Sequence, residues 1–214
     1  YTNCHTGGMV AILEINIMQI LEAVKKHKGR PFMIPDANRM DLPEFCVQMG
    51  YKVGVEIGVD KAKYLRNFLM AGLKMYGVDP WKYYGDYLHP RGQERLDYLY
   101  EHSKRETAEY GDNVTLIRKT SMEAAQDFED NSIDFVYIDG HHGFKYVAED
   151  IWEWTKKVRS GGMIAGHDFA QTKHKESKDP FILNVKHVVI AWTECFDIEN
   201  WYLIGEQIGK EGEK

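Results

Sequence analysis

The sequence lacks the marks of several common classes of protein. Its three cysteines (Cys4, Cys46 and Cys195) are widely spaced and form neither a CxxC pair nor a zinc-binding pattern. Thiols that stay reduced in a cytoplasmic protein are the simplest interpretation. No apolar run approaches the roughly 18 residues that a membrane span needs, and the polar start YTNCHTGG lacks the basic region of a cleavable signal. We therefore expect a cytoplasmic protein with no membrane partner.

An excess of positive charge is missing as well. The 27 lysines and arginines are outnumbered by 33 aspartates and glutamates, which gives a net charge of −6. A general grip on nucleic acid needs a basic face, so we expect a small-molecule substrate and no nucleic-acid partner. With 214 residues, 43% of them hydrophobic, the chain is long enough for one sizeable α/β core.

Glycine is scarce where a dinucleotide-binding protein needs it most. An NAD-binding loop carries the pattern GxGxxG directly after its first strand, whereas here the apolar segment Val53–Ile57 is followed by Gly58 alone. An NAD-dependent oxidoreductase or epimerase also needs a YxxxK pair, and the match by letters at Tyr100 and Lys104 falls in a surface-like helix. That class of enzyme stays an alternative that the pattern disfavours.

Predicted strands and helices alternate along most of the chain. Apolar segments predict strands at 53–57, 73–78, 114–117, 133–138, 162–166 and 201–204, with helices between most of them. Such alternation is typical of a parallel sheet covered on both faces. We expect an α/β fold of the Rossmann-like, doubly wound type, with a mostly parallel seven-stranded sheet and helices on both faces. Residues 31–50, which hold three of the six prolines, look like an irregular connection.

The segment 51–81 has the pattern of a unit that holds a nucleotide-like cofactor by its ribose. Ligands bind at the carboxyl ends of the strands in such sheets, and Gly58 lets the backbone approach a ligand closely. Asp79 follows 21 residues later, where a carboxylate can accept both ribose hydroxyls, and Trp81 can lie against an adenine ring. The unit favours S-adenosylmethionine (SAM) over NAD. A plain strand–helix–strand unit with a turn glycine and a capping acid is the alternative interpretation.

Four short motifs occur in order at fitting distances. They are EIG (56–58), GVDPW (77–81), IDGHH (138–142) and GGMIAGHD (161–168). Over about residues 51–168 the chain resembles the class I SAM-dependent methyltransferases, and within them the small-molecule O-methyltransferases. The resemblance implies that residues 51–208 form the SAM-binding catalytic domain, after an N-terminal helix and connection at 1–50 and before a tail at 209–214.

The resemblance also implies roles for single residues. Glu56 and Gly58 match the first cofactor motif, and Asp79 matches the ribose-binding acid. Further cofactor-binding positions are Tyr64, Trp81, Ser121, Met122 and Asp139. Two positions depart from the pattern: Ala62 stands in place of a third loop glycine, and Thr120 in place of an acid that bonds the adenine amine.

Acids and histidines gather after the fourth and fifth predicted strands. Adjacent parallel strands would bring Asp139, His141, His142, His167 and Asp168 together. Two carboxylates and an imidazole suit a divalent cation, so Asp139, His167 and Asp168 are the predicted ligands of Mg²⁺ or another divalent ion. His142 is the predicted general base and His141 the second candidate, with Asp139 as their catalytic neighbour. Singly, each of them could instead be a turn acid or a solvated histidine.

Together these patterns predict a SAM-dependent methyltransferase that acts on a hydroxyl of a small molecule, such as a sugar or a natural-product intermediate. A histidine base and a divalent metal would assist it. The loops 81–92 and 169–181 are expected to wall the substrate. A non-catalytic SAM-binding domain is the remaining alternative. The first helix and the aromatic content permit a homodimer.

Overall fold

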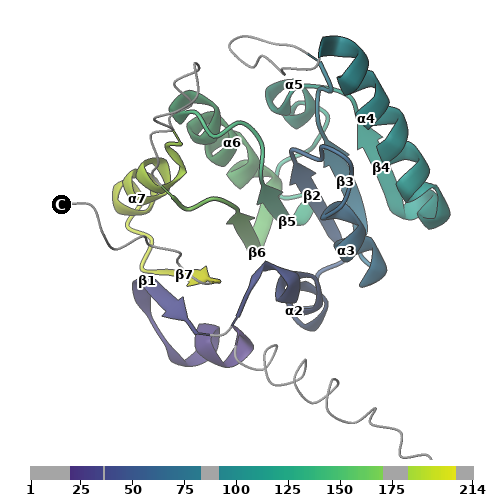
Figure 1. The fold of residues 1–214 in the computed structure, drawn as a ribbon. Coiled ribbons are helices and arrows are strands. Elements are labelled where there is room, and N and C mark those ends of the chain that lie inside the picture. Colours follow the sequence, from purple (N-terminus) through teal and green to yellow (C-terminus); the bar gives the residue numbers. More distant parts are fainter. Residues whose placement is uncertain (1–19, 36, 83–91, 171–182, 206–214) are drawn as a thin grey trace, which may run out of the picture. The chain divides into compact units, whose positions relative to one another are not determined.

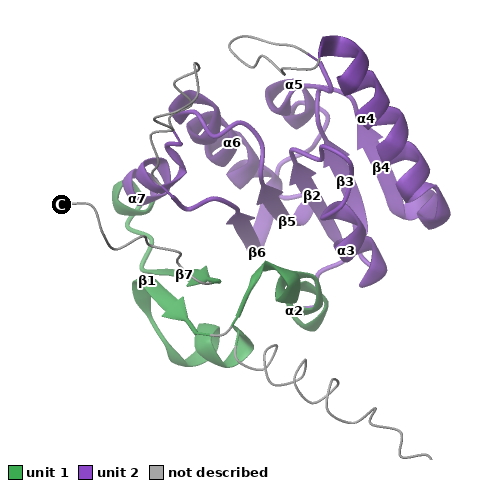
Figure 2. Cartoon of the chain, in the orientation of Figure 1, with its two compact units in different colours: residues 1–49, 193–214 green, residues 50–192 purple. Residues whose placement is uncertain are grey.

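The structure is a computed structural model that describes residues 20–35, 37–82, 92–170 and 183–205. The chain divides into two compact units, Tyr1–Met49 with Thr193–Lys214 and Gly50–Trp192 (Figure 2). Every residue predicted to bind the cofactor, a metal or the reacting groups belongs to the second unit. No helix in the described ranges is both long and apolar enough to span a bilayer.

The first unit contains a small parallel sheet. Strand β1 (Gly29–Ile34) pairs with β7 (Asn200–Ile204), and residues 20–26 are helical. A 3-10 helix, η1 (Arg39–Asp41), leads into helix α2 (Leu42–Gln48). The prediction of an irregular connection at 31–50 was therefore wrong. The prolines suggested a loop, yet Pro43 lies in the first turn of α2, where the missing amide costs no helical hydrogen bond.

The second unit is built on a five-stranded parallel sheet with the strand order β4-β3-β2-β5-β6 (Figure 1). The strands are β2 (Val53–Ile57), β3 (Lys74–Val78), β4 (Val114–Ile117), β5 (Ile133–Ile138) and β6 (Val158–Gly166). The described residues thus form seven strands, but in sheets of five and two, and the segment expected to close the main sheet pairs with β1 as β7. The predicted Rossmann-like, doubly wound fold is confirmed with this correction.

Helices follow the strands of the second unit. They are α3 (Leu65–Met70), α4 (Gly92–Thr107) followed by the 3-10 helix η2 (Ala108–Asn113), α5 (Ser121–Ala125), α6 (Phe144–Lys157) and α7 (Val185–Cys195). The last of them, α7, runs from this unit into the first. The chain order runs outward from β2 to β4 and then returns to β5 beside β2. This reversal places the switch in strand order between β2 and β5, where open α/β sheets bind their ligands.

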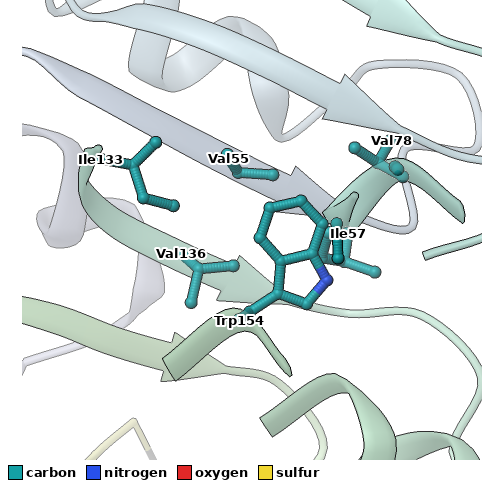
Figure 3. Packing of buried hydrophobic residues seen from close by; sticks show 8 residues of the cluster. Val55, Ile57, Val78, Ile133, Val136 and Trp154 are labelled. Carbon is teal, nitrogen blue, oxygen red and sulfur yellow. The ribbon is translucent and has the colours of Figure 1, made fainter. Parts of the chain in front are cut away.

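The sheet is buried on both faces, which explains the nearly continuous apolar strands. On one face, Val136 of β5 packs in a cluster with Trp154 of α6 (Figure 3). On the opposite face, the ring of Phe68 in α3 lies 5.1 Å from that of Phe135 and 6.0 Å from that of Tyr137. Successive side chains of a strand point to opposite faces, so α3 and α6 are held on opposite sides of the same strand.

Candidate active site

A cavity of about 310 Å³ lies at the carboxyl ends of the strands in the second unit. Its walls come from the tips of β2, β3 and β5, from the start of α5 and from α6. Seven of the predicted site residues line it: Gly58, Asp79, Trp81, Ser121, Met122, Asp139 and His141. The sequence motifs that are far apart in the chain therefore meet around one space.

Gly58 is required by geometry at the switch point. Its φ is +88°, which favours glycine, and an added Cβ would lie 2.2 Å from the carbonyl oxygen of Asp139. Its amide donates to the carbonyl of Val78 at 2.9 Å. The loop after β2 is therefore held against the tip of β5 on one side and that of β3 on the other.

Asp79 organises the neighbouring loops through its carboxylate. One oxygen accepts hydrogen bonds from the amides of Val59 (3.1 Å) and Asp60 (3.0 Å), and the other accepts one from Trp81 (2.8 Å). Burial raises the pKa of Asp79 to about 6, although these three amides oppose the shift. The group is thus mostly ionised at pH 7, and its remaining lone pairs can accept hydroxyl protons from a ribose.

Trp81 forms a fixed wall of the cavity. It is 1% exposed, its Nε1 donates to the carbonyl of Asp60 at 2.7 Å, and its ring centroid lies 4.9 Å from that of Tyr100. Asp60 adopts a φ of +51°, and its carbonyl accepts hydrogen bonds from Trp81 and from Ser103. The indole is therefore oriented before any ligand binds.

Two predicted cofactor residues lie in the core. Glu56 is 2% exposed, and Tyr64 packs its ring 4.6 Å from that of Tyr137 and 5.1 Å from that of Phe68. Neither is among the described residues that line the cavity. The loop after β2 turns at Ala62, which has a φ of +59°, and the aromatic ring of Tyr64 is then buried among other rings.

Sequence reasoning missed a buried acid in the cavity wall, Asp150 of α6. It is 4% exposed, and burial raises its pKa to about 7, against a hydrogen bond from Ser121 that lowers it. A signal was present in the sequence. Asp150 falls on the same helical stripe as Val147, Ile151 and Trp154, where an acid interrupts an apolar face.

A second group of side chains lies at the ends of β5 and β6. Nε2 of His142 is 3.5 Å from Oδ1 of Asp139 and 3.4 Å from Oδ2 of Asp168. One ligand atom from each of these three residues falls within 4.8 Å of the other two. The structure thus places His142, the predicted base, between the two predicted metal-binding carboxylates.

His167 lies next to the same group. Its Nδ1 is 2.9 Å from Oδ1 of Asp168 and 3.8 Å from Oδ1 of Asp139. Asp168 itself has a φ of +53°, a strained conformation for a residue other than glycine. His167 therefore contacts the carboxylate oxygen of Asp168 that does not face His142, an arrangement suited to orienting that carboxylate.

His141 lines the cavity and is not one of the three clustered residues. Its Nδ1 accepts a hydrogen bond from the amide of Gly143 at 3.0 Å, and its ring centroid is 4.1 Å from that of Tyr146. In a neutral imidazole with this bond, the proton is on Nε2. His141 is thus arranged as a hydrogen-bond donor, which weakens its case as a proton acceptor.

Parts of the predicted substrate loops lie outside the described residues. These are 83–91 and 171–182, together with residues 1–19 of the predicted first helix and the predicted tail at 209–214. The candidate site is accordingly defined by the strand tips and by α5 and α6.

The model of a protein family described as a methyltransferase domain matches residues 53–169, more than half of the chain. The chain belongs to this methyltransferase family. The match runs from the first strand of the main sheet to the residue after Asp168, so it contains both the cavity and the three-residue cluster. With the fold described above, the match places residues 53–169 in the class I SAM-dependent methyltransferase family.

Other comparisons agree on the fold. An O-methyltransferase from Bacillus cereus, solved in complex with SAH (S-adenosylhomocysteine), has a TM-score of 0.52 at 15% identity, over 88% of this chain and 80% of that one. A proposed caffeoyl-CoA O-methyltransferase from Staphylococcus aureus has a TM-score of 0.52 at 13% identity, over 87% of this chain and 82% of that one. At such identities the likeness shows the fold.

A relative by sequence is the uncharacterized protein y4gI of Sinorhizobium fredii. It is 29% identical over 103 residues, which are 46% of this methyltransferase and 10% of y4gI. This chain thus spans about a tenth of the length of that curated relative.

Proposed function

We propose that this methyltransferase transfers the methyl group of SAM to a hydroxyl oxygen of a small molecule, with a divalent cation at the acceptor. The observation that carries the proposal is the position of Asp139. Asp139 lines the cavity, and its carboxylate also belongs to the three-residue cluster with His142 and Asp168. The two parts of the site therefore adjoin at one residue, as the alignment of a methyl donor with an acceptor requires.

The cavity fits an adenosyl cofactor. The backbone at Gly58 leaves no room for a side chain, so the wall there is bare backbone. Asp79 would hold the ribose hydroxyls, while Trp81 and Met122 would border the adenine ring. When bound, SAM supplies a methyl group on a sulfonium, already activated for in-line displacement by an oxygen nucleophile.

The cluster fits a divalent cation. Ligand bonds of about 2.1 Å separate neighbouring ligand atoms by about 3.0 Å in octahedral and about 3.4 Å in tetrahedral geometry. His142 Nε2 lies 3.4 and 3.5 Å from the two carboxylates. That atom is shielded from solvent and makes no hydrogen bond with the described part of the chain, which is costly unless a proton or a cation compensates. A bound cation would supply Lewis acidity, which lowers the pKa of a neighbouring hydroxyl.

The protein's own residues then have distinct tasks. Asp139 and Asp168 provide negative charge at the acceptor, and His167 holds the second oxygen of Asp168. His142 directs Nε2 at both carboxylates. It would be a ligand of a bound cation, and without a cation it would be the proton acceptor for the hydroxyl. We retain a sugar or natural-product hydroxyl as the acceptor class, because the acidic chain disfavours nucleic acid.

The direct test is binding followed by turnover. Calorimetry should show that the wild type binds SAH and does not bind NADH. Methyl transfer from SAM to a panel of catechols and sugars should be lost on exhaustive chelation and restored by Mg²⁺ or Mn²⁺. Asp112→Asn is a matched control, because Asp112 is an exposed acid in η2. Turnover that survives chelation would remove the cation from the proposal, and failure to bind SAH would remove the proposal itself.

A further inference from the structure

Asp150 is a buried acid that none of the roles above uses. It faces the cavity from α6 and is 4% exposed. An acid in the wall of a binding cavity, on an otherwise apolar helix stripe, costs free energy of folding unless it has partners. The contacts around Asp150 show which hydrogen-bond donor the protein supplies to the carboxylate and which donor a ligand could supply.

A directional chain of hydrogen bonds fixes one side of the carboxylate. Nε1 of Trp154 donates to Oγ of Ser121 at 2.8 Å, and the Ser121 hydroxyl bonds to Asp150. An indole N–H can only donate, and a serine hydroxyl has a single proton. The Ser121 proton therefore goes to Asp150. Trp154 is fully buried, so this series of hydrogen bonds begins in the hydrophobic core (Figure 3).

Two other polar groups of the cavity wall already have hydrogen-bond partners in the protein. Thr120, at the position where related enzymes can carry an acid, caps α5. Its amide donates to the Glu123 carboxylate at 3.0 Å, and its hydroxyl lies 2.8 Å from the same carboxylate. Asp79 accepts three backbone amides at the opposite wall. Asp60 and Glu149 also line the cavity, but both are more exposed and lie within 4.0 Å of a lysine. Asp150 is the buried carboxylate beside Ser121 and Met122, where the adenine is expected.

We propose that Asp150 accepts a hydrogen bond from the exocyclic amine of the cofactor's adenine and thereby selects adenosine over inosine. The proposal rests on the proposed SAM site. A carboxylate can only accept, adenine offers its amine as the donor on that edge, and hypoxanthine has a carbonyl oxygen there instead. Burial raises the pKa of Asp150 to about 7, and an N–H donor at its second oxygen would favour the ionised form.

The Ser121 chain makes the effect of Asp150→Asn directional. In the wild type the Ser121 hydroxyl donates to Asp150, so we expect the new amide to keep this bond, with its oxygen towards Ser121 and its NH₂ towards the cavity. Two NH₂ groups then face one another when adenine binds, whereas a hypoxanthine carbonyl finds a donor. The variant should therefore reverse the base preference and keep the shape of the site.

Calorimetry with two ligands tests this reversal. Wild type should bind SAH more tightly than S-inosylhomocysteine, by about tenfold or more. The affinity of Asp150→Asn for SAH should be about tenfold lower than that of the wild type, and the variant should bind S-inosylhomocysteine more tightly than SAH. 5′-Methylthioadenosine lacks the amino acid. The substitution should lower its affinity by the same factor as that of SAH, because Asp150 would contact the base. Asp112→Asn should change none of these values.

The other possible results of this experiment contradict either the role of Asp150 or the proposed function. Equal binding of both nucleosides by the wild type overturns the inference without needing any variant. It is also overturned if Asp150→Asn weakens both ligands equally, or weakens SAH but not 5′-methylthioadenosine, which would move Asp150 to the amino-acid end. If the wild type binds neither nucleoside, the proposed function fails. If it binds SAH and only the reversal is absent, the proposed function stands.

Discussion

At the ends of β2 and β3, the polar atoms of the site are hydrogen-bonded to the protein backbone, whereas at the ends of β5 and β6 they face one another. Asp79 accepts three amide hydrogen bonds and is mostly ionised at pH 7. Asp139 and Asp168 instead lie on either side of His142, at 3.5 and 3.4 Å from its Nε2. The cofactor half is thus complete on its own, while the acceptor half needs a proton or a cation to offset two adjacent carboxylates.

The largest expected effect is a loss of methyl transfer without a loss of cofactor binding, which would separate the acceptor half of the site from the cofactor half. Asp168→Asn removes one of the two charges at the acceptor, so methyl transfer should fall by about 10³-fold, while SAH affinity should change by less than about twofold. Assayed turnover and SAH calorimetry measure the two effects, and the electron paramagnetic resonance of Mn²⁺ reports loss of the cation. A large loss of SAH affinity would break the comparison, because it would show that the halves are not separate.

The opposite pattern is expected for Asp79→Asn. An amide cannot accept from all three loop amides and from a ribose, so the dissociation constant of SAH should rise by about 100-fold. Binding of Mn²⁺ should stay within about twofold of the wild type, since none of its proposed ligands contacts Asp79. Calorimetry with each ligand separately checks this. Unchanged affinity for SAH would remove Asp79 from the cofactor site.

A pair of glycine variants tests whether the halves touch at Gly58. Gly72 has nearly the same φ as Gly58 (+86° against +88°), but an added Cβ there meets nothing within 4 Å. Gly72→Ala should therefore cost only the backbone strain, about 1 kcal/mol of unfolding free energy. Gly58→Ala adds the clash with Asp139, so it should cost about 3 kcal/mol. Urea denaturation measures both, and equal costs would contradict the close approach.

The preference of the site for one cation over another tests which residues of the acceptor half are its ligands. An imidazole ligand favours Mn²⁺ and later transition metals over Mg²⁺, which prefers oxygen. The wild type should bind Mn²⁺ about tenfold more tightly than Mg²⁺, and His142→Asp should reduce that ratio. Asp112→Asn is the control, because Asp112 is an exposed acid in η2 and does not belong to the cluster. An unchanged ratio in His142→Asp would exclude His142 as a ligand.

The smallest effect concerns pH and the ligand-free protein. Burial raises the pKa of Asp150 from 3.8 to about 7, so folding favours its protonated form. The stability that this preference contributes is fully present below pH 3.8 and is lost as pH rises towards 7. Asp150→Asn cannot ionise, so its melting temperature should fall less than that of the wild type between pH 4 and 8. Parallel curves for the two proteins would contradict the shift.

Much of the fold could be predicted because its signals are local. Three strands of the main sheet, at 53–57, 114–117 and 133–138, begin and end where the apolar runs do. β1 and β7 could not be assigned to a separate sheet, because the pairing of segments about 170 residues apart leaves no trace in either segment alone. The prolines near β1 also concealed it.

The site divides in the same manner. Residues at strand tips, such as Gly58, Asp79 and Asp139, could be placed because parallel strands end at one edge. Tyr64 could not, since its position depends on how the loop turns at Ala62. The approach of His142 to Asp168 could be predicted from the adjacent strand ends, but the choice of His142 over His167 as the clustered histidine could not, because it depends on the path of two loops. Asp150 was missed because its partner, Ser121, is 29 residues away in sequence.

The contact between Gly58 and Asp139 has a consequence for how this enzyme can evolve. The carbonyl that blocks a side chain at Gly58 belongs to the same residue whose carboxylate joins the cluster. Any drift of the first strand tip therefore shifts the anchor of the second, and neither can be remodelled without the other. New acceptors are therefore more readily accommodated by changing the loops around this pair than by changing the pair itself.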